Sequence, residues 1–268
     1  MKEVTLKIND IPVTVPEGTR ILDAARKAGF NIPTLCYYKD LTNEGSCRVC
    51  VVEVKGARSL VASCSAVVAE GMEVYTNTPK VLKSRKTTLE LLLSNHEKKC
   101  LSCVRSGNCE LQKLSNEYGC DENHYHGIKT PVNVEEYNAY LVRDNAKCIL
   151  CRRCVAMCNK VQSVGVIGAN NRGFNTSIGC AFERSLGAVD CVACGQCITV
   201  CPVGALTERD DTQFVVDALH DKTKTVIVGT APSVRVALGE EFGYPIGTDV
   251  EGKMVAALRR LGFNKVFD

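Results

Sequence analysis

The chain has 268 residues, which is long enough for two or more domains, and its mixture of apolar and charged residues is that of a globular protein. Its 17 cysteines are an abnormal number, and no signal peptide or bilayer-length apolar run is recognisable, so we expect a cytoplasmic, reducing location where disulfides are rare. The formal net charge of +3 counts every cysteine as neutral, so it does not indicate nucleic-acid binding if these cysteines bind metal as thiolates.

Residues 1–78 predict a small β-rich domain. Residues 4–8 and 11–15 alternate apolar and polar side chains, and Asn9-Asp10 between them predicts a hairpin turn. A helix is expected over residues 21–28, with Thr19 as its N-cap and Gly29 at its end.

Four cysteines of this domain predict a [2Fe-2S] site. The spacing C-x10-C-x2-C-x13-C keeps the C-x2-C core of plant-type ferredoxins but lengthens the first loop. Four buried, metal-free cysteines are the alternative, but four within 29 positions of loop-like sequence favour a cluster. The expected ligands are Cys36, Cys47, Cys50 and Cys64.

Residues 79–120 predict a helix followed by a second metal site. Leu82, Leu89, Leu92 and Leu93 repeat at helical spacing, with Lys and Arg expected on the opposite face. The pattern H-x3-C-x2-C-x5-C then offers one imidazole and three thiols, which could hold a [4Fe-4S] cluster of raised potential or, alternatively, zinc. The expected ligands are His96, Cys100, Cys103 and Cys109.

Residues 121–138 are expected to form an irregular connector, in which His124-Tyr125-His126 lacks the further ligands that a metal site needs. Residues 139–210 follow with the most specific motif of the chain, C-x2-C-x2-C-x3-C, which occurs twice and ends the second time in proline. This is the two-cluster bacterial ferredoxin pattern, in which the fourth cysteine of each run binds the cluster of the other run.

The doubled motif therefore predicts two [4Fe-4S] clusters. Zinc usually takes two C-x2-C pairs for each ion, and disulfides need an oxidising compartment, so both alternatives fit less well. Cys120 and Cys180 remain and are interpreted as structural, and two short strands are expected between residues 164 and 187. The first cluster is assigned to Cys148, Cys151, Cys154 and Cys201, and the second to Cys158, Cys191, Cys194 and Cys197.

Residues 221–268 predict the beginning of an α/β domain. A buried-type strand at residues 225–229 is followed by helices at 234–242 and 250–261 and by a strand at 265–267.

In this order, and with A-P-S-V-R-V-A-L-G-E-E-F at residues 231–242, the chain resembles the N-terminal iron–sulfur region of the catalytic subunit of [FeFe]-hydrogenases, especially the electron-bifurcating, NAD(P)H- and ferredoxin-linked kind. Residues 1–110 are also similar to the large iron–sulfur subunit of respiratory complex I and to NAD-dependent formate dehydrogenases. The resemblance implies an α+β fold with a ubiquitin-like β-grasp ferredoxin domain, a His-ligated [4Fe-4S] segment, a two-cluster module and the start of a catalytic domain. It also implies iron rather than zinc at His96.

The resemblance further implies an oxidoreductase with one [2Fe-2S] and three [4Fe-4S] clusters. Its partners would be a flavin subunit that oxidises NAD(P)H, a small [2Fe-2S] subunit and ferredoxin. In that family the hydrogen-activating centre is held by cysteines of the domain that starts at Thr225, and this sequence has no cysteine after Cys201, so a relay with no catalytic residue of its own is expected. The relay arm of a formate dehydrogenase and a non-catalytic polyferredoxin are the alternatives.

Overall fold

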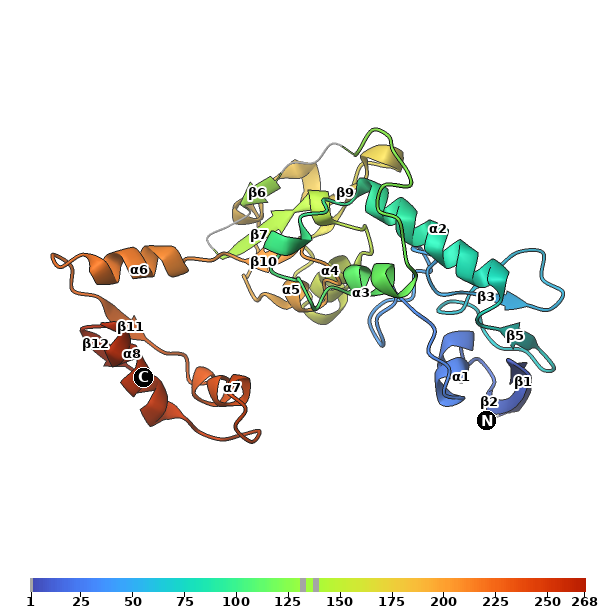
Figure 1. Cartoon of the computed structure of the whole chain (residues 1–268), viewed down its shortest axis with the longest axis horizontal. Helices are drawn as coiled ribbons and strands as arrows, with labels where there is room; N and C mark the ends of the chain where they lie inside the picture. The colour runs from blue at the N-terminus through green and yellow to red at the C-terminus, as the bar shows by residue number, and fades with distance from the viewer. Residues whose placement is uncertain (1, 131–133, 137–139) are drawn as a thin grey trace. The chain divides into compact units, whose positions relative to one another are not determined.

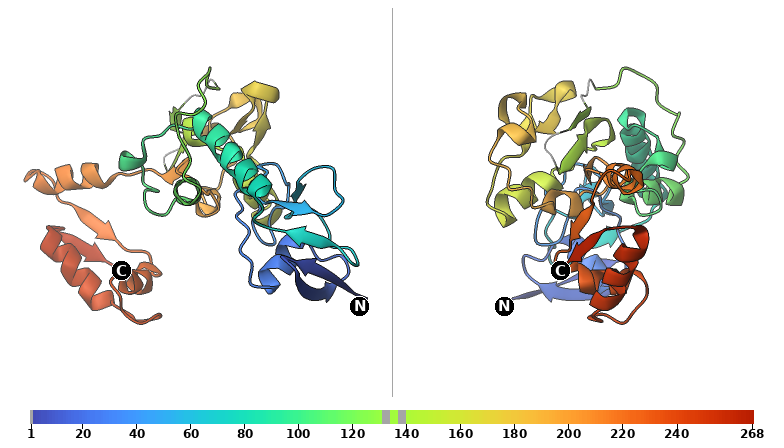
Figure 2. Two further views of the ribbon diagram at one scale, coloured as in Figure 1. Left: turned by 45° about the vertical axis from the view of Figure 1, so that its right-hand side comes forward. Right: turned by 90° about the vertical axis from the view of Figure 1, so that its left-hand side faces the viewer.

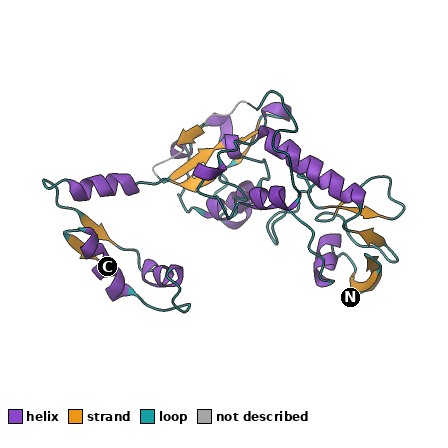
Figure 3. Ribbon diagram, viewed as in Figure 1, coloured by secondary structure: helices purple, strands orange, loops and turns teal. Residues whose placement is uncertain are grey.

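The computed structural model describes residues 2–130, 134–136 and 140–268 (Figure 1). The chain divides into two compact units, Met1–Arg209 and Asp210–Asp268. Within the described ranges, no helix is both long enough and apolar enough to cross a bilayer. Helices and strands are mixed in both units, as Figure 3 shows.

The first unit begins with a mixed five-stranded sheet. Strand β1 pairs antiparallel with β2 and parallel with β5, and β3 lies antiparallel between β5 and β4. The predicted hairpin turn is confirmed, because Asn9 and Asp10 both have positive φ (48° and 66°), as the tight turns between paired strands require. The sheet runs in the order β2 (Ile11–Pro16), β1 (Glu3–Ile8), β5 (Glu73–Tyr75), β3 (Val51–Val54) and β4 (Val61–Ala62).

One helix, α1 (Ile21–Lys27), packs its apolar face into the core of this sheet. Gly29 ends it with a φ of +84°, as expected. The predicted N-cap was wrong: Arg20 occupies that position without a side-chain cap, and the Thr19 hydroxyl instead donates to the Pro16 carbonyl at 2.7 Å.

Helix α2 (Pro79–Asn95) runs from this sheet toward the rest of the unit (Figures 1 and 2). The Thr78 side chain accepts a hydrogen bond from the Val81 N–H and caps the helix. The expected division of its faces was partly wrong, because Leu82 is 43% exposed whereas Arg85 is buried. The reason is that Arg85 reaches the Val51 carbonyl of β3 at 2.7 Å.

The remainder of the first unit is built from short elements. The connector expected to be irregular contributes strand β6, although residues 131–133 and 137–138 lie outside the described residues. The two strands expected between residues 164 and 187 are confirmed and pair antiparallel. These elements are α3 (Glu110–Glu117), β6 (Val134–Glu136), β7 (Leu141–Asp144), α4 (Arg153–Ala156), a π-helix (Met157–Val161), β8 (Gly168–Asn170), β9 (Ser177–Gly179), α5 (Gln196–Thr199) and β10 (Leu206–Glu208), with 3-10 helices at Cys100–Ser102, Asn145–Lys147, Gly173–Asn175, Ala181–Glu183 and Leu186–Ala188.

The second unit has the predicted β-α-α-β order. Strand β11 (Ile227–Gly229) pairs parallel with β12 (Lys265–Phe267), and helices α7 (Val234–Glu241) and α8 (Glu251–Leu261) connect them. An additional helix, α6 (Thr212–His220), precedes β11. The expected burial of the first strand was wrong, since Ile227 is 55% exposed.

Candidate iron–sulfur sites

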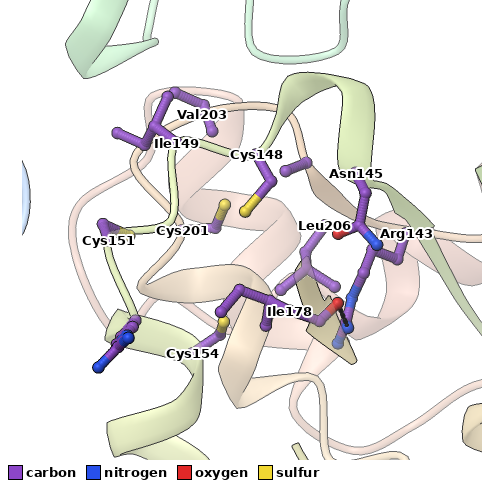
Figure 4. Close-up of a pocket in the computed structure, with 12 residues that line it drawn as sticks. Arg143, Asn145, Cys148, Ile149, Cys151, Cys154, Ile178, Cys201, Val203 and Leu206 are labelled. Carbon is purple, nitrogen blue, oxygen red and sulfur yellow. Dashed lines mark hydrogen bonds between the residues drawn. The ribbon is translucent and has the colours of Figure 1, made fainter. Parts of the chain in front are cut away.

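The first pocket gathers three sulfurs of the first cysteine run and one of the second (Figure 4). It contains about 370 Å³ of empty space, and Ile178 and Leu206 close its apolar wall. Its four cysteines are the predicted set Cys148, Cys151, Cys154 and Cys201.

A second pocket of similar size, about 350 Å³, gathers the complementary set. Cys158 leaves the first run within the π-helix and joins three cysteines of the second run. Each pocket therefore takes its fourth sulfur from the other run. The cysteines of this second pocket are Cys158, Cys191, Cys194 and Cys197.

The two runs follow the same backbone course. Leu150 and Arg152, between the first three cysteines, have φ of 54° and 60°, and Ala193 and Gly195 repeat this at 51° and 71°. Left-handed residues turn successive N–H groups toward the inside of a loop. The Leu150 N–H accordingly donates to Cys148 Sγ at 3.4 Å, which suits a loop that wraps a sulfur-rich anionic core.

A third pocket, of about 280 Å³, lies where α2 ends. His96 is buried, and its Nδ1 atom has no hydrogen-bond partner among the described residues. Burial lowers the pKa of this imidazole, whereas a hydrogen bond to the Lys147 backbone raises it by a smaller amount. A neutral imidazole is the form that binds metal. The pocket is lined by the predicted ligands His96, Cys100, Cys103 and Cys109.

Gly204, which lies three residues after the last cysteine of the second run, lines this third pocket. A Cβ atom at that position would lie 2.5 Å from Cys103 Sγ, which is closer than real Cβ contacts allow. The segment after Cys201 therefore contacts the site through a residue without a side chain.

The remaining set lies in the N-terminal domain, and its thiols lie close enough to shift one another's pKa. The neighbouring Cys47 and Cys64 thiols lower the pKa of Cys36 far below its usual range, while the pKa of both neighbours is raised. The neighbouring Cys64 thiol lowers the pKa of Cys50 to about 7. The four predicted ligands Cys36, Cys47, Cys50 and Cys64 are thus in mutual contact.

Burial keeps three thiols of the first pocket, those of Cys148, Cys151 and Cys154, protonated when no metal is bound. It raises the pKa of Cys148 to about 11 and that of Cys151 to about 12. The positive charge of Arg143 acts against this effect of burial. It lowers the pKa of Cys148 and Cys154 in this pocket and of Cys197 in the second pocket. Metal binding must therefore displace protons from these thiols, and the buried Arg143 guanidinium lowers the free-energy cost of forming the thiolates.

The donor chemistry of all four sets fits iron–sulfur clusters. No three His, Cys, Asp or Glu side chains of the described chain converge closely enough to hold a single ion. The ligands of a cluster need not converge on one point, because they are spread over several iron atoms, one for each iron of a [4Fe-4S] core and two for each iron of a [2Fe-2S] core. Ligation itself stays a prediction, as does the structural role of Cys120 and Cys180, which lie outside the four sets.

Three residues near these sites were not expected. Arg143 is buried beside the first pocket, Arg153 is buried between two of its cysteines, and Gly204 contacts the third pocket. Of these three residues, only Gly204 could have been noticed in the sequence, because a glycine often marks a place where the backbone closely approaches another group.

Four protein-family descriptions match successive parts of the chain. A 2Fe-2S iron–sulfur cluster binding domain matches residues 1–79, and the NADH-ubiquinone oxidoreductase-G iron–sulfur binding region matches residues 85–124. The ferredoxin-like domain of NADH-quinone oxidoreductase subunit 3 matches residues 139–207. The C-terminal domain of the iron only hydrogenase large subunit matches residues 224–268. The likeness to complex I, expected over residues 1–110, therefore reaches residue 207.

Curated relatives give the same result over longer stretches. The chain is 50% identical over its whole length to the NADP-reducing hydrogenase subunit HndD of Solidesulfovibrio fructosivorans, of which it covers 47%. It is 38% identical over 98% of its length to iron hydrogenase 1 of Clostridium pasteurianum, of which it covers 46%. It is also 38% identical, over 77% of its length, to the mitochondrial NADH-ubiquinone oxidoreductase 78 kDa subunit of Neurospora crassa, of which it covers 28%.

A solved structure of NAD⁺-reducing [NiFe]-hydrogenase in the H₂-reduced state contains a chain of similar fold. The TM-score is 0.71 at 29% identity, over 77% of this chain and 87% of that one. The chain spans less than half the length of the curated relatives described. The two hydrogenases among them match at least 98% of it, whereas the complex I subunit matches 77%. The chain belongs to the [FeFe] (iron-only) hydrogenase large subunits, of which it forms the N-terminal iron–sulfur region.

Proposed function

We propose that this chain is the electron-relay part of a multisubunit [FeFe]-hydrogenase. It would carry electrons between a flavin subunit that oxidises NAD(P)H, a small [2Fe-2S] subunit or ferredoxin, and a centre that catalyses 2H⁺ + 2e⁻ ⇌ H₂. The observation that carries the proposal is that one compact unit gathers four separate sets of iron-compatible ligands.

The residues of this chain would bind, orient and shield the clusters. Iron–sulfur clusters supply one-electron transfer, so a nicotinamide hydride, which delivers two electrons, needs a flavin partner to divide the pair. The thiolates would anchor each core, the left-handed loops would direct N–H groups at sulfur, and Ile178 and Leu206 would exclude water from the first pocket.

The finer assignments belong to the same proposal. The four ligand sets would hold one [2Fe-2S] and three [4Fe-4S] clusters, and the mixed sheet with α1 would be a β-grasp ferredoxin domain. The domains would span residues 1–78, 79–120, 139–210 and 221–268, with 121–138 as connector.

Two names among the relatives support the nicotinamide link. One is an NADP-reducing hydrogenase subunit and the other an NAD⁺-reducing [NiFe]-hydrogenase. The match of residues 224–268 to a hydrogenase domain favours this function over a complex I or formate dehydrogenase arm. Electron bifurcation is proposed from the family resemblance alone.

Counting iron and acid-labile sulfide in the chain purified without oxygen tests the proposal. About 14 irons per chain are expected, and zinc at the His96 site would instead give about 10 irons and one zinc. Replacing Cys194 with Ala should remove one [4Fe-4S] signal from the low-temperature electron paramagnetic resonance (EPR) spectrum. A folded, iron-free wild-type chain, or an unchanged spectrum in the variant, contradicts the proposal.

A further inference from the structure

Arg153 lies in the middle of the first cysteine run, and its side chain is only 3% exposed. Its guanidinium donates two hydrogen bonds to the Glu110 carboxylate, at 2.6 and 2.8 Å. A third hydrogen bond, from Nη2, reaches the Tyr37 carbonyl at 3.1 Å. The guanidinium carbon also lies 5.3 Å from the centre of the Tyr38 ring, within the range of a cation–π contact.

Both hydrogen-bond partners of Arg153 are direct neighbours of a predicted cluster ligand. Tyr37 follows Cys36 of the [2Fe-2S] set, and Glu110 follows Cys109 of the His-containing set. Arg153 itself precedes Cys154 of the first two-cluster pocket. One side chain therefore joins the ligand loop that contains it to the ligand loops of two other sites.

A backbone hydrogen bond completes this junction. The Glu110 N–H donates to the Pro202 carbonyl at 3.0 Å, and Pro202 follows Cys201, the fourth sulfur of the pocket that Arg153 borders. Glu110 is thus held from both sides by the two-cluster module.

We propose that Arg153 is a positioning residue that fixes the separations between three of the clusters, an inference that rests on the proposed relay function. A planar guanidinium that binds a carboxylate with two parallel hydrogen bonds fixes direction as well as distance. Electron tunnelling weakens steeply with separation, so a small displacement of the Cys36 or Cys109 loop changes the transfer rate more than it changes the fold. Lysine carries the same charge but offers only a point contact.

Other links between the same loops are weaker. Lys160 donates to the Leu41 carbonyl at 3.3 Å, and Arg152 pairs with Glu44 at 3.6 Å across an exposed surface. Exposed pairs of this kind contribute little to holding a geometry. Replacement of Arg153 should therefore change the distances between clusters without changing the number of clusters that the chain holds.

The test uses the full chain, purified without oxygen, as wild type, Arg153→Lys and Arg153→Gln. Arg172→Gln serves as the matched control, because it makes the same chemical change at an exposed position of the same module. Three quantities are measured: iron and sulfide content, the EPR relaxation of the reduced [2Fe-2S] cluster with the other clusters oxidised and then reduced, and amide hydrogen exchange of residues 36–42.

In the wild type and in Arg172→Gln, reduction of the neighbouring clusters should speed the relaxation of the [2Fe-2S] signal through spin–spin coupling. In Arg153→Lys, full iron content should remain while this enhancement weakens and exchange of residues 36–42 becomes faster. Unchanged enhancement in Arg153→Lys overturns the proposal, and so does loss of its iron, because the residue would then be needed to build a site rather than to space it. Iron missing from the wild type would instead contradict the proposed relay function.

Discussion

Arg143 is 2% exposed and lies beside the first four-cysteine pocket (Figure 4). Its Nη1 atom donates to the Ile178 carbonyl, and its charge acts on cysteines of both pockets. The period-2 pattern of strand β7 places it on the same face as buried Leu141. The ligands could be predicted because their spacing repeats a motif, but the burial of a cation beside them depends on tertiary packing that no local pattern encodes.

Replacing Arg143 with Gln should lower the reduction potential of the clusters beside it. A cluster gains negative charge when it is reduced, so loss of a nearby positive charge should cost about 1–2 kcal/mol, or roughly 40–90 mV for one electron. An EPR-monitored redox titration measures the midpoints, with Arg143→Lys as the charge-preserving control. Equal midpoints in wild type and Arg143→Gln would show that the charge is too well screened to matter.

Among the elements, the short loops of the cluster module were harder to predict than the helices and strands around them. The hairpin of β1 and β2 and the β-α-α-β order of the second unit follow from periodicity and turn residues. By contrast, Leu150 and Arg152 adopt left-handed conformations that their residue types do not favour. The expected position of Arg85 failed for a related reason, since its side chain bonds to a carbonyl brought close by the fold. Thr19 differs, because its hydroxyl bonds to the Pro16 carbonyl within the same turn.

Replacing Gly204 with Ala should disturb the His-containing site specifically. The added methyl group would meet Cys103 Sγ at 2.5 Å, so the loop must shift at a cost of about 1–3 kcal/mol. We expect up to about four irons to be lost, with the other EPR signals intact. Gly168→Ala is the control, because a Cβ there meets nothing within 4 Å. Full and stable iron content in Gly204→Ala would mean that the loop accommodates the methyl group freely.

At the scale of the whole molecule, all 17 cysteines belong to the unit Met1–Arg209, and Asp210–Asp268 has none. In the first unit, many of the buried apolar positions of the two-cluster module are cysteines themselves. Metal ligation there would add to a modest hydrophobic core, whereas the second unit depends on helix and strand packing alone.

Removing iron with a chelator should therefore loosen the two units unequally. Amide hydrogen exchange should become faster through residues 140–209, because buried thiols and left-handed loops lose the group that holds them. Protection of β11, β12 and α8 should change little. An equal loss of protection in both units would indicate that they unfold together.

The exchange of the fourth sulfur between the two runs also bears on how such a chain matures during synthesis. On the proposed ligation, the second core of the two-cluster module cannot be completed until Cys197 has left the ribosome, and the first not until Cys201, whereas the ligands of the N-terminal domain are all available after Cys64. Loading would then proceed in two stages, an early one for the first domain and a later one for the paired cores. A cell short of iron or sulfide would accumulate chains in which the N-terminal domain holds its cluster and the two-cluster module holds none.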